Sequence, residues 1–153
     1  MAADGNMKAT YRLATLADAD RLFDIRRRSI TALATKKMSA AEAEAWAATL
    51  TPAGMEKKLR ELEIWVAEVS DEIVGWGAIY GDRLEGLYTD PKFTGRGIGT
   101  ELLRLLEALM QGRGISSVRA EASSNAEEFY LRRGYEPTGA RTPEGAQPIS
   151  KRL

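Results

Sequence analysis

The sequence contains no cysteine and no histidine, and these two absences exclude more functions than any other feature of its composition. The chain therefore has no imidazole base, no thiolate nucleophile and none of the common zinc ligands. Ser-His-Asp hydrolases, cysteine proteases, zinc hydrolases and enzymes with an acyl-cysteine intermediate are excluded. Any acid or base must be Asp, Glu, Lys, Tyr or water, and we expect no metal site.

An excess of one charge and a long apolar run are also lacking. The 22 Lys and Arg residues balance the 22 Asp and Glu residues, without a basic stripe, so we expect no nucleic-acid partner. No apolar run approaches the ~20 residues of a membrane-spanning helix, and residues 1–6 do not form a basic and then apolar leader. We expect a cytoplasmic protein without a membrane partner, with residues 1–6 flexible.

What the sequence does contain is typical of one globular domain over residues 1–153. Hydrophobic residues make up 44% and charged residues 29% of the chain, with no low-complexity tract. A chain of this length buries roughly two-thirds of the surface that it exposes when unfolded. Its core therefore needs no disulfide or metal for support.

The first sixty residues predict one strand and three helices. Ser39 and Glu42 form a capping box, and Thr51 with Pro52 has the pattern of a helix start. In the first helix we interpret the arginine run 26–28 as a solvated face. The predicted elements are a strand at 9–13 and helices at 15–33, 39–50 and 51–61.

After the third helix, apolar residues recur at every second position, as in strands. The segments between these strands are short, which indicates an antiparallel meander. A helix of about four turns then joins two strands, so those strands should lie parallel through a right-handed crossover. The predicted strands are 64–69, 73–80, 84–89, 115–122, 135–138 and 147–153, and the helices begin at the glycines of 95–99 and at Asn125. The expected fold is α/β of the α+β kind, with a mixed, mostly antiparallel sheet of about seven strands, flanking helices and a parallel crossover between the fourth and fifth strands.

The cluster Gly95-Arg96-Gly97-Ile98-Gly99 lies between a strand and a helix, where backbone amides can converge on a phosphate. It is not a P-loop, because no Lys-Ser or Lys-Thr follows it. It is not a dinucleotide-binding motif either, because Thr100 replaces the third glycine and an antiparallel meander precedes it. For this cluster alone, a tight turn would be the better interpretation.

A second motif changes that interpretation. The segments LYTDPKFTGRGIGTELL (87–103) and NAEEFYLRRGY (125–135), in this order, resemble the GNAT superfamily of acyl-CoA-dependent N-acyltransferases. The order of elements along nearly the whole chain fits that fold. The resemblance implies direct transfer from acetyl-CoA, the acyl-donor substrate, to a small amine or a peptide amine, and by analogy a homodimer.

The resemblance also implies which residues contact the donor. The strand edge would pair with the pantetheine arm, the glycine-rich turn would bind the pyrophosphate, and one asparagine would contact the cofactor arm. These residues are Leu87, Tyr88 and Thr89 for the edge, Gly95, Arg96, Gly97, Ile98, Gly99 and Thr100 for the turn, and Asn125 for the arm. The family usually has Gln or Arg where Thr94 stands, so we expect rearranged loop support there.

For the chemistry we choose one acid and one base. The motif resembles those that put a phenol beside the CoA sulfur, so we choose Tyr130 as the acid, with Phe129 packed inward. We choose Glu85 as the base, acting directly or through water, because it lies two residues before Leu87 and should share its face of the strand. A core tyrosine and a salt-bridged carboxylate are the alternative interpretations. The alternative bases are Asp82, Glu121 and Glu136.

The acceptor is not encoded in any motif. The resemblance implies that residues 30–50 and 138–147 bound the acceptor site, whereas the aromatic residues at strand or helix spacing are more often core. Those aromatics are Trp46, Trp65, Trp76 and Tyr88. Two other functions stay open: an acyl-CoA sensor, which binds without turnover, and a structural domain, which does not bind CoA.

Overall fold

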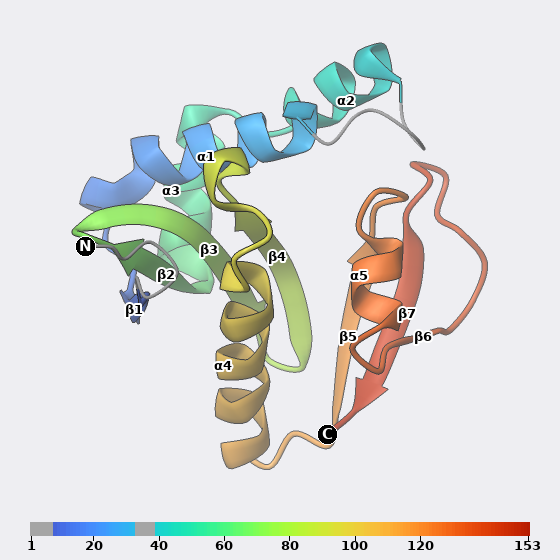
Figure 1. Cartoon of the computed structure of the whole chain (residues 1–153). Helices are drawn as coiled ribbons and strands as arrows, with labels where there is room; N and C mark the ends of the chain where they lie inside the picture. Colours follow the sequence, from blue (N-terminus) through green and yellow to red (C-terminus); the bar gives the residue numbers. More distant parts are fainter. Residues whose placement is uncertain (1–7, 33–38) are drawn as a thin grey trace.

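The computed structural model describes residues 8–32 and 39–153 (Figure 1). Our expectations for residues 1–6 and for the end of the first helix at Leu33 fall outside the described residues.

A mixed sheet of seven strands forms the centre of the protein, in the order β1-β2-β3-β4-β5-β7-β6. β4 and β5 are parallel, and every other neighbouring pair is antiparallel. The predicted fold class, with its crossover between the fourth and fifth strands, is confirmed. The strands are β1 (Thr10–Leu13), β2 (Glu63–Val69), β3 (Glu72–Tyr80), β4 (Arg83–Thr89), β5 (Ser117–Ala122), β6 (Glu136–Pro137) and β7 (Gln147–Arg152).

Local sequence signals explain where most helices begin. The Ser39 hydroxyl accepts the Glu42 N–H at 3.0 Å while the Glu42 carboxylate accepts the Ser39 N–H at 2.9 Å, which is the predicted capping box. At the third helix the Thr51 hydroxyl accepts the Gly54 N–H at 3.0 Å, a single capping bond without the reciprocal carboxylate. The last helix begins at Glu127 and not at the predicted Asn125, because a hydrogen-bonded turn from the Ala126 N–H to the Ser123 carbonyl precedes it. The helices are η2 (Leu16–Asp18), α1 (Ala19–Ala32), α2 (Ala40–Ala47), α3 (Pro52–Glu61), η3 (Pro91–Phe93), α4 (Ile98–Gly112) and α5 (Glu127–Leu131).

Helices cover both faces of the strands β1 to β4. On one face, Leu22 of α1 and Met55 of α3 pack in a cluster with Trp76, whose indole N–H donates to the Leu22 carbonyl at 3.0 Å. On the other face, Leu102 and Leu106 of α4 are fully buried. These two layers fix α1 and the start of α4 against opposite faces of β4.

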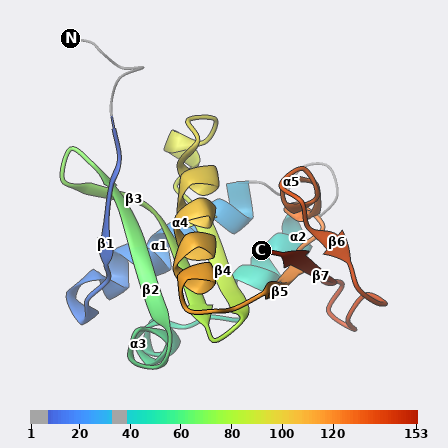
Figure 2. The same cartoon turned by 90° about the horizontal axis from the view of Figure 1, so that it is seen from below.

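The sheet splits between β4 and β5. These strands are in register only at Arg83 and Arg119, next to a hydrogen bond from the Arg119 N–H to the Asp82 carbonyl at 2.9 Å. Beyond that point they diverge, and β5, β7, β6 and α5 form a second half of the molecule in both views (Figures 1 and 2). Among the described strands, none pairs with the β5-facing edge of β4 beyond Arg83.

No helix within residues 8–32 and 39–153 has the length and apolar character needed to cross a membrane.

Candidate active site

Two cavities open where the sheet splits. The first, which we call the α4 cavity, has a volume of about 460 Å³ and lies between the end of β4, the turn that leads into α4, and α5. The second, the α1 cavity, has a volume of about 300 Å³ and lies between α1, α2, α3, β4 and β5.

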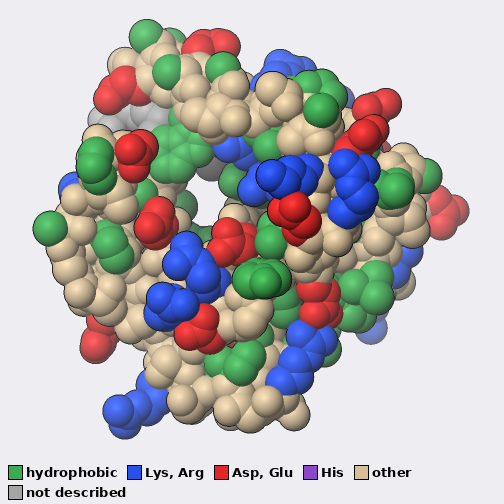
Figure 3. Space-filling model, turned by 180° about the vertical axis from the view of Figure 1, so that it is seen from behind, with side chains coloured by type: hydrophobic (Ala, Val, Ile, Leu, Met, Phe, Trp, Pro, Cys, Tyr) green, Lys and Arg blue, Asp and Glu red, His purple; other side chains and the backbone are tan. Residues whose placement is uncertain are grey.

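The two cavities share part of their lining. The shared residues are Ser29, Leu87, Asn125, Ala126 and Tyr130. The space-filling view shows an opening through the molecule, with basic and acidic side chains on its rim (Figure 3). Molecules that enter from the two sides would therefore meet beside Leu87 and Tyr130.

The turn before α4 contains two left-handed glycines and ends in the free amides of a helix N-terminus. Gly95 and Gly97 have φ of 79° and 80°, a left-handed conformation that other residues adopt only with strain. The first hydrogen bond of α4 runs from the Glu101 N–H to the Gly97 carbonyl, so the preceding amides have no acceptor within the helix. Five of the six predicted turn residues line the α4 cavity, namely Gly95, Gly97, Ile98, Gly99 and Thr100.

The sixth predicted residue, Arg96, does not line the cavity. Its guanidinium lies over the Phe93 ring, 5.3 Å from the centroid. Thr94, which replaces the family's Gln or Arg, donates its hydroxyl hydrogen to the Pro91 carbonyl at 3.1 Å. A hydrogen bond between Thr94 and Pro91 therefore stabilises the turn, in place of the long side chain that the family usually has at this position.

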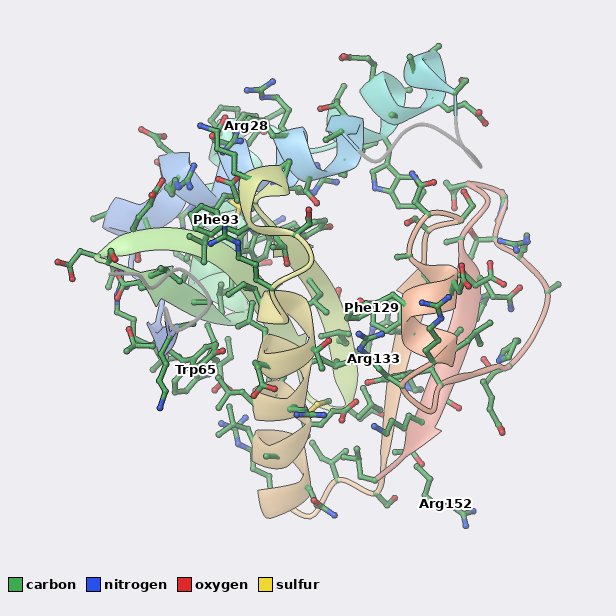
Figure 4. The ribbon with its side chains drawn as sticks, viewed as in Figure 1. Arg28, Trp65, Phe93, Phe129, Arg133 and Arg152 are labelled. Carbon is green, nitrogen blue, oxygen red and sulfur yellow. The ribbon has the colours of Figure 1, made fainter. Side chains whose placement is uncertain are left out.

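A buried ion cluster anchors the same turn to α1. Asp90, with a side chain that is 1% exposed, accepts hydrogen bonds from Arg28, Arg21 and the Lys92 N–H. Burial alone would raise the pKa of Asp90, but these bonds outweigh it and lower the pKa to about 2. Arg28 reaches from α1 toward the turn that carries Phe93 (Figure 4). The carboxylate thus stays ionised and holds the turn in place.

Arg133 is a site residue that the sequence analysis missed. Its guanidinium donates to the Thr100 hydroxyl at 2.7 and 3.1 Å and lies 3.7 Å from the centroid of the Phe129 ring. Both side chains project toward α4 and line the α4 cavity (Figure 4). Their spacing of four residues is the signal that could have paired them.

The two aromatic residues of the second motif pack in the same core cluster, Phe129 inward as expected, and both also line the α4 cavity. Phe129 lines the α4 cavity and is only half-buried, whereas Tyr130 is 6% exposed. Tyr130 packs against Tyr135 with ring centroids 5.3 Å apart, yet it lines both cavities. Burial, followed by the neighbouring Tyr88, raises the pKa of Tyr130, so its hydroxyl keeps its proton at neutral pH.

The predicted base, Glu85, lines the α1 cavity and accepts a hydrogen bond from Arg83 at 2.7 Å. Our argument that it shares a face with Leu87 by simple alternation was wrong. Ile79 pairs with Leu84 and Ala78 with Gly86, so Glu85 occupies a β-bulge where the alternation breaks. Glu85 and Leu87 nevertheless line the same cavity.

Of the alternative bases, only Glu121 lines the α1 cavity. Asp82 pairs with Arg119 at 3.0 Å, where β4 and β5 are still in register, and Glu136 is exposed on β6. Within the described ranges, no group of three or more acidic residues is placed to hold a metal ion.

The aromatic residues divide between the core and the α1 cavity. Trp76 is a core residue and Trp65 packs against the core, as expected, but Trp46 and Tyr88 line the cavity. The segments expected to bound the acceptor site contribute Ile30, Trp46 and Ala146 to its lining, and residues 33–38 lie outside the described residues.

Our interpretation of the arginine run as a solvated face was wrong. Only Arg27, with its side chain 52% exposed, fits it. Arg26 is buried at 7% exposure and lines the α1 cavity, and Arg28 binds Asp90. The helical turn of about 100° per residue separates three consecutive side chains onto different faces, and Arg26 falls four residues after Leu22, on the buried side.

Comparisons with known proteins point to one family and one fold. The sequence model of the acetyltransferase (GNAT) domain matches residues 34–146. The chain is 28% identical over 109 residues to the uncharacterized N-acetyltransferase YafP of Escherichia coli K12, covering 71% of this chain and 69% of that protein. It is 34% identical over 82 residues to the peptidyl-lysine N-acetyltransferase YjaB of Salmonella typhimurium LT2, and there the match spans only 53% of this chain and 55% of the relative.

Solved structures share the fold. A GCN5-related N-acetyltransferase from Rhodopseudomonas palustris superposes with a TM-score of 0.88 at 28% identity, covering 96% of this chain and 98% of that one. The PaiA N-acetyltransferase from Thermoplasma acidophilum, solved in complex with coenzyme A, has a TM-score of 0.80 at 20% identity, with 96% and 100% coverage.

Proposed function

The chain belongs to the GNAT acetyltransferase family and is an N-acetyltransferase, and we propose that it moves the acetyl group of acetyl-CoA directly to a primary amine of a small molecule or a peptide. The observation that carries this proposal is the meeting of two cavities beside Tyr130. A direct transfer requires donor and acceptor to be bound at the same time with their reacting atoms in contact. Two cavities with a shared wall meet that requirement.

The α4 cavity is the donor side in this proposal. Its left-handed glycines and the first amides of α4 would bind the pyrophosphate, and the unpaired edge of β4 at 87–89 would pair with the pantetheine arm. Asn125, on the shared wall, would contact that arm. Bound in this way, acetyl-CoA supplies a thioester whose carbonyl carbon accepts the amine.

The α1 cavity is the acceptor side. Glu85 would take a proton from the substrate ammonium, directly or through water, because only the neutral amine has a lone pair for attack. The new C–N bond forms as the C–S bond breaks. Tyr130 would donate its hydroxyl proton to the departing sulfur and would regain a proton from the nitrogen as the amide forms. Its raised pKa keeps the hydroxyl protonated at neutral pH. A homodimer remains part of the proposal by analogy alone.

Isothermal titration with acetyl-CoA, followed by CoA release with a panel of amines, tests the proposal. Because the chain has no cysteine, a thiol-reactive dye reports only the CoA released. Binding together with amine-dependent release is the expected result. Binding without release to any amine would favour the sensor, and no binding would overturn the proposal.

A further inference from the structure

The α1 cavity contains a buried positive charge that no carboxylate of the described residues neutralises. Arg26 is 7% exposed, and its guanidinium donates to the Ala47 carbonyl at 3.2 Å and to the Thr49 hydroxyl at 3.1 Å. Both acceptors are uncharged. Since a buried charge without a counter-ion is unfavourable, a group that carries the opposite charge is expected where such a residue lines a cavity.

The other arginines of α1 provide the contrast. Arg21, Arg27 and Arg28 each form ion pairs with Asp24, and Arg21 and Arg28 also bind Asp90. All three are more exposed than Arg26 and therefore have less need of a partner. The most deeply buried arginine of the helix is thus the one without a carboxylate partner in the described part of the chain.

A second cation lies on the same wall. Lys58 of α3 lines the α1 cavity, is half-buried and forms no ion pair with the described carboxylates. The opposite wall has two carboxylates and one cation: Glu121 lies on β5, and Glu85 of β4 forms an ion pair with Arg83, which lines the cavity as well. The cavity is therefore polarised: Arg26 and Lys58 lie on its helical side, whereas on the strand side Arg83 offsets Glu85 and the carboxylate of Glu121 is left over.

We propose that the acceptor is an amine that also carries a carboxylate, as a free amino acid does. The carboxylate would bind Arg26, with Lys58 contributing at longer range, and the amine would lie on the strand side near Glu85 and Tyr130. Arginine favours carboxylates because its planar N–H groups match the two oxygens. A cavity of about 300 Å³ suits a molecule of this size. This inference rests on the proposed function, whose acceptor it narrows.

The test compares each of the common amino acids with its carboxamide, which keeps the amine and the side chain but removes the negative charge. Acetyl-CoA is the donor, and CoA release is measured for the whole chain. At least one acid should be preferred over its amide by about tenfold or more in kcat/KM. In Arg26→Met the ratio of kcat/KM for the acid to kcat/KM for its amide should fall toward one, because the KM for the acid rises. The Kd for acetyl-CoA should stay unchanged.

Arg27→Met is the matched control, because it removes a neighbouring charge of the same helix that is 52% exposed and lines neither cavity. Arg27→Met should keep the wild-type preference for the acid over its amide. If Arg26→Met does not fold, Lys58→Met should still reduce the preference for the acid, by a smaller factor.

Equal rates for acids and amides, or transfer to none of the acids by a protein that binds acetyl-CoA, would overturn the inference but not the proposed function. A protein that binds no acetyl-CoA would contradict the proposed function itself.

Discussion

Arg28 of α1 donates two hydrogen bonds to the carboxylate of Asp90, at 3.1 and 2.7 Å, across 62 residues of sequence. Arg21 adds a third at 2.7 Å. Asp90 directly follows β4 and also accepts the Lys92 N–H at the start of η3. The position of the glycine-rich turn therefore depends on an ion cluster that belongs to a different helix.

Replacing Asp90 with asparagine should loosen this anchor. An amide cannot neutralise Arg21 and Arg28, so these two partly buried guanidinium groups would lose their most buried counter-ion and keep only the more exposed Asp24 and Glu72. We expect the free energy of unfolding, measured by urea titration, to fall by about 3 kcal/mol. The Kd for acetyl-CoA should rise as well, because the turn is no longer fixed.

Glu72→Gln is the control for this variant. Glu72 also pairs with Arg21, at 3.3 Å, but its side chain is 58% exposed. Its loss should change stability by less than about 1 kcal/mol. Equal losses in the two variants would contradict the anchoring role of Asp90.

The same carboxylate predicts how stability depends on pH. The pKa of Asp90 in the folded protein is lowered to about 2, below its value in an unfolded chain near 3.9. Its contribution is therefore complete above about pH 5 and is lost as the pH falls toward 2, by an amount on the order of 2 kcal/mol. Without histidine, no side chain with an unperturbed pKa titrates between pH 5 and 8.

Urea unfolding at a series of pH values measures this dependence. The free energy of unfolding should be nearly constant from pH 6 to 8 and should fall below about pH 4.5. Asp90→Asn should flatten the acid part of the curve. If the free energy of unfolding of Asp90→Asn depended on pH in the same way as that of the wild type, the prediction would be contradicted.

Much of the fold could be predicted from local patterns. Two-residue alternation predicted the meander of β2, β3 and β4, and the Ser39 to Glu42 spacing predicted the start of α2. These features depend on residues close in sequence. The parallel pairing of β4 and β5 was predicted from the helix that joins them, because a helical crossover leaves few alternatives.

The shape of the site could not be predicted in the same way. The opening depends on β4 and β5 diverging after Arg83, and the placement of Glu85 depends on a bulge in the pairing with β3. Arg26 was misinterpreted because its partners, Ala47 at the end of α2 and Thr49 in the turn after it, leave no pattern within α1. Such features follow from contacts between distant segments.

Gly97→Ala tests the glycine-rich turn. At a φ of 80°, alanine would be strained by about 1–2 kcal/mol, although the new Cβ would meet no atom within 4 Å. Both the free energy of unfolding and the affinity for acetyl-CoA should therefore fall. Titration calorimetry measures the latter.

Gly112→Ala is the control, at the other end of α4. Its new Cβ also meets open space, Gly112 does not have positive φ, and it lines neither cavity. The affinity should stay unchanged, with stability equal or up to about 1 kcal/mol higher. Wild-type affinity in Gly97→Ala would refute a role for this turn in donor binding.

Tyr130→Phe tests the proposed acid. It removes only the hydroxyl, so kcat should fall by about 100-fold while the Kd for acetyl-CoA changes little. Tyr135→Phe is the matched control: its ring packs against Tyr130 and its hydroxyl donates to Glu107 at 2.7 Å, but it lines neither cavity. It should lower stability and leave kcat near the wild-type value. Unchanged turnover in Tyr130→Phe would remove the acid assignment.

Glu85→Gln tests the proposed base through the pH profile of kcat/KM. A carboxylate base must be ionised to accept a proton, so protonating it should produce a limb of falling activity at acid pH. Glutamine cannot titrate, so that limb should disappear and the plateau should drop. Glu121→Gln is the comparison, because Glu121 lines the same cavity from β5 and was an alternative base. If the limb disappears in Glu121→Gln and remains in Glu85→Gln, the base lies on β5. If both variants keep it, the proton leaves through water, and the ion pair of Glu85 with Arg83 is structural.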